Sequence, residues 1–191
     1  MYNIRKYEVV KVGDCFTTKS CGTCTVIAVE GNGTSSSQVT VKFDSTGYVK
    51  IARCSELRRG HVRDPYSPTV FGVGYLGEGK YKGDSVADAY NAWYAMMQRA
   101  YSGKHYINCT VATEWHDFQV FAEWYYSHYK PDYQLDKDIL SDTRQYGPNT
   151  CVYVPRSVNS AEAALRHSVK DCPELQQVLN SFLQVVKSNY L

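Results

Sequence analysis

The first sixty residues alternate apolar and polar side chains in short runs, and turn-forming residues separate the runs. Val39-Thr40-Val41-Lys42-Phe43 alternates cleanly, the run Tyr48–Ile51 follows the turn Asp44–Gly47, and Cys24–Val29 is a third β-like run. Alternation with a period of two is typical of strands with one buried face. Because the runs are short and their turns contain glycine, we predict a small antiparallel β-barrel over residues 1–62, a module for binding or positioning.

Prolines and glycines interrupt the pattern between residues 63 and 84. Asp64-Pro65-Tyr66-Ser67-Pro68 breaks regular structure, and a glycine-rich run from Phe71 to Gly79 follows it. This run has neither the GK[ST] ending nor the strand-to-helix setting of a nucleotide-binding loop. We therefore predict a linker whose glycines permit an unusual backbone path.

Apolar residues return at three- and four-residue spacing between residues 85 and 130, which predicts two amphipathic helices. The first prediction covers Val86–Tyr101 and the second covers Glu114–Tyr129. The predicted buried stripes are Tyr90, Trp93, Met97 and Ala100 in the first helix, and Trp115, Phe118, Phe121 (or Ala122) and Tyr125 in the second. Stripes of this kind usually form a core, so we predict a helical support for the segment that follows.

Residues 131–159 show the pattern of a strand, a turn, a second strand and a helix. Leu135–Ile139 and Cys151–Val154 are the β-like runs, Tyr146–Asn149 is the turn, and a helix-forming segment follows Asn159. This order predicts a compact ββα unit within residues 85–160. Asp136 on the first strand and Asn159 at the helix start offer oxygen ligands, which suit a hard divalent cation such as Mg²⁺.

The last segment, residues 161–191, is predicted to be helical, which makes the chain α+β as a whole. Its apolar stripe consists of Leu175, Val178, Leu179, Phe182, Val185 and Val186. The stripe can pack back on the body of the protein, or it can form a dimer or a partner-binding helix. The sequence leaves both interpretations open.

Composition adds little to this picture. The 191 residues carry a formal net charge of +2, which is too small to indicate nucleic-acid binding by itself, although cations can still cluster locally. The candidate phosphate contacts are Arg58, Arg59, Arg63, Arg144 and Arg156. The alternative for the basic segment around Arg58 is a solvated connector.

The seven cysteines fit a reduced compartment. Their number is odd, Met1–Arg5 lacks the apolar region of a signal peptide, and no run is long enough to span a membrane. Cys21-Gly22-Thr23-Cys24 is a CxxC pair, which can be half of a zinc site or a redox pair. Because no second pair accompanies it and Gly22 favours a turn, a hairpin flanked by cysteines is preferred to zinc.

Motifs in a fixed order resemble one family. They are Tyr90-Asn91-Ala92-Trp93, then Cys109 to Phe118, then Leu135-Asp136-Lys137-Asp138, then Tyr146-Gly147-Pro148-Asn149-Thr150-Cys151. This order resembles phage-encoded HNH-type homing endonucleases and their nuclease-like relatives. The β-module before it also resembles one found in some of these proteins. The resemblance covers nearly all of the chain up to Asn159, and it implies a phage protein in the host cytoplasm that contacts double-stranded DNA.

The resemblance also implies roles for individual residues. The ββα unit would hold one Mg²⁺ or Mn²⁺ ion beside the scissile phosphate, with Asp136 and Asn159 as metal ligands and Asn149 as the asparagine of the hairpin loop. Lys137 stands where the family has the histidine that activates water. A lysine with an unperturbed pKa of about 10.4 is charged at neutral pH. It can therefore stabilise the charge of a phosphate, but it cannot act as a base unless it is strongly desolvated.

Three functions follow from these patterns. The first is a metal-dependent DNA endonuclease or nickase whose site is weakened by Lys137. The second is a nuclease-derived protein that binds DNA without cutting it. The third is a factor that binds a host protein through the β-module or the C-terminal helix.

Overall fold

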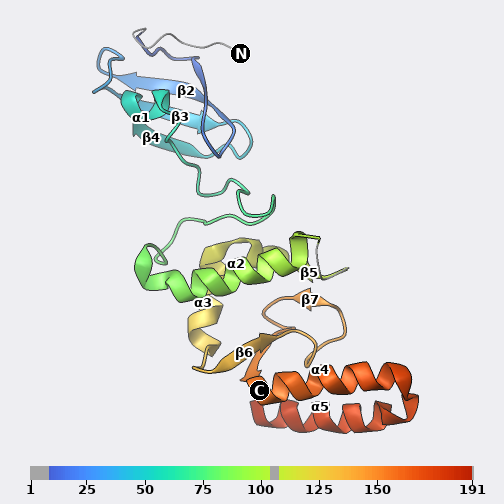
Figure 1. Cartoon of the computed structure of the whole chain (residues 1–191). Coiled ribbons are helices and arrows are strands. Elements are labelled where there is room, and N and C mark those ends of the chain that lie inside the picture. Colours follow the sequence, from blue (N-terminus) through green and yellow to red (C-terminus); the bar gives the residue numbers. More distant parts are fainter. Residues whose placement is uncertain (1–8, 104–107, 191) are drawn as a thin grey trace. The chain divides into compact units, whose positions relative to one another are not determined.

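The chain divides into two compact units, residues 1–78 (unit 1) and residues 79–191 (unit 2), and the boundary falls inside the segment 63–84 (Figure 1). The computed structural model describes residues 9–103 and 108–190. Met1–Arg5, on which the prediction of no signal peptide rests, lies outside the described residues. No helix in the described part of the chain is long and apolar enough to cross a membrane.

Unit 1 is an antiparallel sheet in which each strand pairs with the next one along the chain, followed by a short helix. The strands are β1 (Cys15–Thr17), β2 (Thr23–Glu30), β3 (Gln38–Phe43) and β4 (Val49–Arg53), and the helix is α1 (Cys54–Arg58). The register of β2 against β3 shifts between Val26 and Ala28, which places a bulge at Ile27. The strands in residues 24–51 therefore lie close to their predicted positions.

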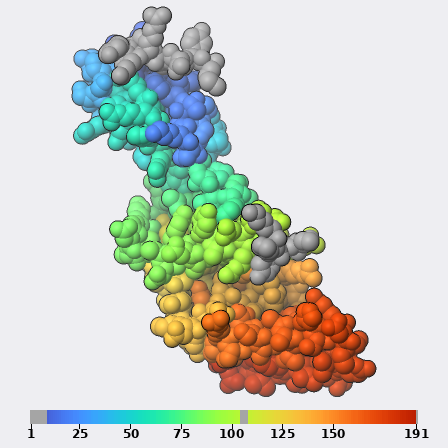
Figure 2. All heavy atoms as spheres, in the orientation of Figure 1, coloured from blue at the N-terminus to red at the C-terminus, as the bar shows by residue number. Residues whose placement is uncertain are grey.

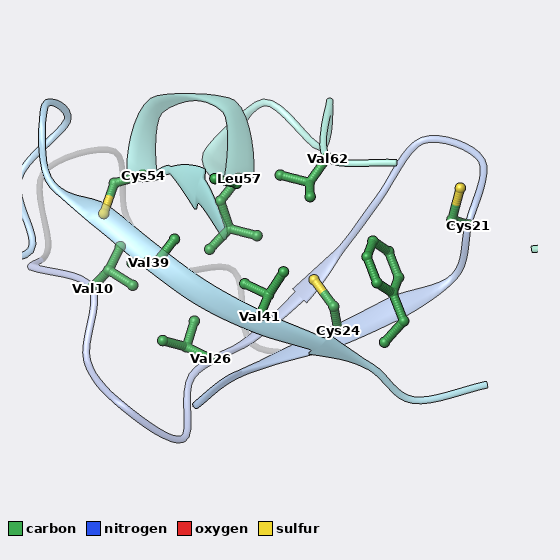
Figure 3. Packing of buried hydrophobic residues seen from close by; sticks show 11 residues of the cluster. Val10, Cys21, Cys24, Val26, Val39, Val41, Cys54, Leu57 and Val62 are labelled. Carbon is green, nitrogen blue, oxygen red and sulfur yellow. The ribbon is translucent and has the colours of Figure 1, made fainter. Parts of the chain in front are cut away.

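The core of unit 1 lies between the sheet and α1 (Figure 3). Val39, Val41 and Phe43 alternate along β3 and are buried, as their spacing predicts. Leu57 of α1 is buried against the same cluster. Burying a side chain of this size stabilises a fold by roughly 1.5–3 kcal/mol, so α1 is an integral part of unit 1.

The predicted barrel is wrong, because in the part of unit 1 that the structure describes the sheet does not close. A barrel requires its last strand to pair with its first, whereas β1 pairs with β2 and β4 pairs with β3. The chain instead enters α1 directly after β4, and Cys54 and Leu57 cover the core there. A short helix thus replaces the strand pairing that the alternating pattern predicts.

Unit 2 combines helices with two small sheets. Its helices are η1 (Asp84–Val86), α2 (Ala87–Tyr101), η2 (Thr113–His116), α3 (Phe118–His128), α4 (Arg156–Asp171), η3 (Pro173–Leu175) and α5 (Gln176–Tyr190). Its strands are β5 (Thr110–Val111), β6 (Tyr133–Asp136), β7 (Gln145–Tyr146) and β8 (Val152–Pro155). β5 pairs with β7 in parallel and β6 pairs with β8 antiparallel. The α+β class predicted from the sequence is confirmed.

Aromatic side chains fill the space between α2 and α3. Trp93, Trp115 and Phe121 are fully buried, and the Trp93 indole Nε1 donates to the Trp115 carbonyl oxygen at 2.7 Å. The second predicted helix is in two parts, η2 and α3. Asp117 separates them, because its Oδ1 accepts the Gln119 backbone N–H at 2.8 Å and so caps a new helix.

The helices α4 and α5 form an antiparallel pair (Figure 1), and in Figure 2 their orange and red atoms form one continuous body. Val186 of α5 belongs to a core cluster with Ile139 and Val154. The apolar stripe of the last helix therefore packs on unit 2, while Val178 and Val185 are exposed.

Candidate functional site

The polar residues predicted on β6 and at the start of α4 line one cavity in unit 2. Antiparallel pairing places Asp136 opposite Val152, and α4 begins directly after β8, so Asn159 returns to β6. The cavity has a volume of about 640 Å³. Its polar lining consists mainly of Arg99, Asp136, Lys137, Asp138, Asn159 and Glu162, and we call it the carboxylate cavity.

Asp136 is held rigidly by its own turn. The side chain is buried, with 6% of its surface exposed, and its Oδ1 accepts the backbone N–H groups of Asp138 at 2.7 Å and Ile139 at 2.8 Å. Among the described residues no donor bonds its second oxygen, Oδ2. Burial raises the pKa of Asp136 above its usual 3.8, and the two backbone hydrogen bonds oppose that rise. One oxygen thus fixes the turn and the other is left for a ligand.

Lys137 is buried beside Asp136 and is engaged with Asp138. Its Nζ donates to both carboxylate oxygens of Asp138, at 2.7 and 2.6 Å, and lies 5.6 Å from the centre of the Tyr146 ring. The Lys137 ammonium group thus contacts a carboxylate and an aromatic face, two groups that attract a cation. The geometry therefore suits charge stabilisation and not the abstraction of a proton from water.

Asn159 presents its amide to the same cavity from α4. Its Nδ2 donates to Gln134 Oε1 of β6 at 2.7 Å, which ties the start of the helix to the strand. Because the amide nitrogen is used in this bond, the atom left for a cation is Oδ1. Strand and helix thus each bring one side-chain oxygen to the lining of the carboxylate cavity.

Glu162 is a site residue that the sequence prediction missed. It lies three residues after Asn159 on the same face of α4, it is 2% exposed, and its Oε1 accepts from Arg166 Nε. Burial raises the pKa of Glu162 above its usual 4.5, Arg166 opposes that rise, and Asp136 adds to it. The spacing of three from Asn159 is the signal in the sequence that could have identified this residue.

Arg166 connects Glu162 of α4 to the loop after β6 through hydrogen bonds. Besides Glu162, it donates to Asp142 Oδ1 at 2.7 Å and to the Asp138 carbonyl oxygen at 2.5 Å. The loop after β6 is therefore attached to α4 at two points. This attachment fixes the distance between the acidic turn and the helix.

Two side-chain oxygens that line the carboxylate cavity could hold a hard cation that keeps most of its water. Within residues 9–103 and 108–190, no three His, Cys, Asp or Glu side chains gather closely enough to hold a metal ion. Mg²⁺ often binds through one or two protein oxygens and completes its shell with waters and substrate phosphates. Asp136 Oδ2 and Asn159 Oδ1 can supply that minimum, and a cation between them would favour the charged form of a carboxylate that burial disfavours.

Asn149 does not line the carboxylate cavity. Its side chain is exposed and lines a different cavity of unit 2, together with His128, Lys130, Tyr153 and Lys187. The structure thus brings Asp136, Lys137 and Asn159 together and leaves Asn149 outside their group.

The predicted arginines are distributed over both units. In unit 1, Arg58 donates to the Gly33 carbonyl oxygen at 3.2 Å and to Ser35 Oγ at 3.3 Å, which is a structural role, while Arg59 and Arg63 are exposed. In unit 2, Arg144 and Arg156 are exposed.

Arg99 is a cation of unit 2 that the sequence prediction missed. It lines the carboxylate cavity, and Arg99, Lys137 and Arg144 all act electrostatically on Cys109, so they lie in one neighbourhood.

The CxxC pair in unit 1 belongs to a loop and to the core. Cys21 Sγ accepts the Asp64 backbone N–H at 3.4 Å, which clasps the hairpin to the chain after α1. Cys24 is buried in the sheet, and burial raises its pKa to about 11. Both thiols thus have roles in the structure of unit 1.

Comparisons of the chain with protein-family models, with characterised proteins and with solved structures find no match.

Proposed function

We propose that unit 2 is a divalent-metal-dependent DNA endonuclease or nickase of the HNH type, built on the β6–β8–α4 unit. The observation that carries the proposal is the meeting of Asp136 and Asn159 in one cavity, each with an oxygen left for a ligand. The order of motifs from Tyr90 to Asn159 supports the same family. Mg²⁺ or Mn²⁺ bound there would polarise a phosphate and acidify a bound water.

The residues around the two ligands have complementary tasks. Asp136 would orient the ion, because its Oδ1 is already fixed by two backbone N–H groups. Lys137 and Arg99 would stabilise negative charge on a phosphate, since both line the cavity. Glu162 is a further buried carboxylate in the cavity, and Arg166 holds it in place.

A nicking assay with the full chain tests the proposal. We expect slow conversion of supercoiled plasmid to the open circle with Mg²⁺ or Mn²⁺ and none with EDTA. Asp136→Asn should reduce the rate by about tenfold to a hundredfold or more, since groups that only orient metal ligands already have an effect of that size. The matched control is Asp132→Asn, an exposed aspartate just before β6 that does not line the cavity.

The variant Lys137→His, measured in the same nicking assay, tests whether the lack of a general base at position 137 limits the rate. An imidazole at this position can accept a proton near neutral pH, so we expect faster nicking than in the wild type. If highly purified wild type and Lys137→His both fail to nick plasmid with any metal, the endonuclease proposal is wrong.

DNA binding without cleavage is the second candidate function, and the Lys137–Asp138 ion pair favours it. A lysine committed to a carboxylate leaves the site without the usual proton acceptor. This function predicts salt-dependent DNA binding that EDTA does not change, together with no nicking. Failure to bind DNA at low salt would contradict both candidates.

A further inference from the structure

Unit 2 has a second cavity whose charge is opposite to that of the carboxylate cavity. It has a volume of about 630 Å³, and its lining includes His128, Lys130, Asn149, Tyr153, Lys187 and Tyr190. No carboxylate side chain occurs among the described residues that line it. Within the described part of the chain neither lysine forms an ion pair, and the Lys130 Nζ lies 5.6 Å from the centre of the Tyr133 ring. No carboxylate therefore neutralises either charge.

Separate segments bring these groups together. His128 ends α3, Lys130 follows it, Asn149 lies in the loop before β8, and Lys187 comes from the last turn of α5. Because α5 packs on β8 through the cluster that contains Val186, Lys187 has a fixed place in the wall. Its Nζ donates to the Leu140 carbonyl oxygen at 3.4 Å, which uses one of its three N–H groups.

His128 is held in a defined orientation. Its ring stacks on Trp124 with a centroid separation of 4.4 Å and an interplanar angle of 13°. Its Nδ1 is 2.8 Å from the Trp124 carbonyl oxygen, and since a carbonyl can only accept, Nδ1 carries a proton. The remaining ring nitrogen, Nε2, is then the one that a ligand can engage.

We infer that this second cavity binds a nucleotide of the DNA strand, with its phosphate on Lys130 and Lys187 and its base against the half-buried Tyr190. The volume lies within the roughly 300–1,000 Å³ of ligand pockets. Paired lysines suit a phosphate, tyrosine rings suit a base of any sequence, and the exposed amide of Asn149 can contact a base edge. In this proposal Asn149 contacts the nucleotide in the second cavity, although it lies apart from Asp136.

The position of Tyr153 connects the two cavities. This residue of β8 lines both the second cavity and the carboxylate cavity. Because the two cavities share this residue, a strand with a phosphate in the carboxylate cavity would have a nearby nucleotide at the second cavity. DNA as the source of the nucleotide rests on the proposed function, whereas the cavity itself is independent of the metal ligands.

Calorimetric titration of the full chain in EDTA tests this inference. The probes are inorganic phosphate, thymidine 5′-monophosphate and a short single-stranded thymidine oligonucleotide. We expect the mononucleotide to bind more tightly than phosphate, and the oligonucleotide at least as tightly as the mononucleotide. The double variant Lys130→Gln/Lys187→Gln should weaken mononucleotide binding by about tenfold or more, because two charge-assisted contacts are lost. Lys170→Gln, an exposed lysine of α4 outside the cavity, is the matched control.

The outcomes separate this inference from the proposed function. Mononucleotide binding that survives in Asp136→Asn and is lost in the double lysine variant supports the second cavity, even if no nicking is found. Equal affinity for phosphate and mononucleotide, or a double variant that binds as Lys170→Gln does, overturns the inference. Binding of the mononucleotide without the oligonucleotide overturns the assignment to a DNA strand.

Discussion

At the residue scale, two buried carboxylates distinguish the carboxylate cavity of unit 2. Asp136 and Glu162 are both buried, and burial raises both pKa values. Their charged forms are therefore disfavoured in the folded state relative to the unfolded chain. Carboxylates with perturbed pKa values cluster at functional sites, and the proposed cation would compensate the charge of these two.

The free energy of unfolding should depend on pH, because the charged form of Asp136 is disfavoured in the folded state. Because the folded pKa is raised above 3.8, the folded state binds more protons than the unfolded state just above that pH. The contribution of Asp136 to the free energy of unfolding therefore falls as the pH rises from about 4 through the folded pKa. Asp136→Asn keeps an Oδ1 acceptor for the backbone N–H groups of Asp138 and Ile139, so we expect it to lose less stability than the wild type between pH 4 and pH 7. Urea unfolding without metal measures the difference, and a constant gap across this range would contradict the assignment.

At the element scale, α5 shows how one stripe combines buried and exposed positions. Val186 is 4% exposed and Val185 is 60% exposed, although they are adjacent. Val186→Asp places a charge in the cluster with Ile139 and Val154, and we expect it to cost several kcal/mol, about 3 or more. Val185→Asp, the matched control, should change stability by less than about 0.5 kcal/mol. Thermal unfolding and size-exclusion chromatography of both variants provide the measurements.

The chromatography also addresses the predicted dimer. If α5 served as a dimer helix through its exposed valines, Val185→Asp would lower the apparent molecular mass at constant stability. Equal losses of stability in the two variants would contradict the packing of α5 described above.

Local patterns predicted the elements of this fold better than the way the elements meet. The alternation of Val39, Val41 and Phe43 correctly predicted a strand with one buried face, and the spacing of Trp93 and Met97 correctly predicted a buried helical stripe. The prediction that the sheet closes into a barrel was wrong, because closure depends on which strand edges pair and alternation does not determine that pairing. Tertiary packing decides such questions.

The candidate site follows the same division between local and tertiary information. Asp136 and Asn159 were predicted because one lies on a strand and the other at a helix start, each with a suitable oxygen. Asp136 is the last residue of β6. Glu162 was missed because its burial depends on α4 lying against β6, and Arg166 then holds it there. The separation of Asn149 from Asp136 arises from the long segment between β6 and β8, which includes β7 and whose path no spacing rule predicts.

At the scale of the whole molecule, each unit has its own core, and the three tryptophans are all in unit 2. Trp93, Trp115 and Trp124 therefore report on the unfolding of unit 2 alone. Leu57→Ala removes a fully buried side chain from the core of unit 1, which typically costs about 2–5 kcal/mol. We expect urea unfolding followed by far-ultraviolet circular dichroism to show an earlier transition in this variant, while the tryptophan fluorescence midpoint stays unchanged.

The matched variant for this experiment is Phe121→Leu in unit 2. Its side chain is fully buried beside Trp115 and Trp124, so it should lower the fluorescence midpoint and leave the transition of unit 1 in place. Together the two variants determine whether a loss of stability in one unit reaches the other. If the fluorescence midpoint falls in Leu57→Ala, the two units unfold as one. A loss of activity in an Arg59 or Arg63 variant could then come from lower stability of unit 2, and its stability would have to be measured before a role in DNA contact is assigned.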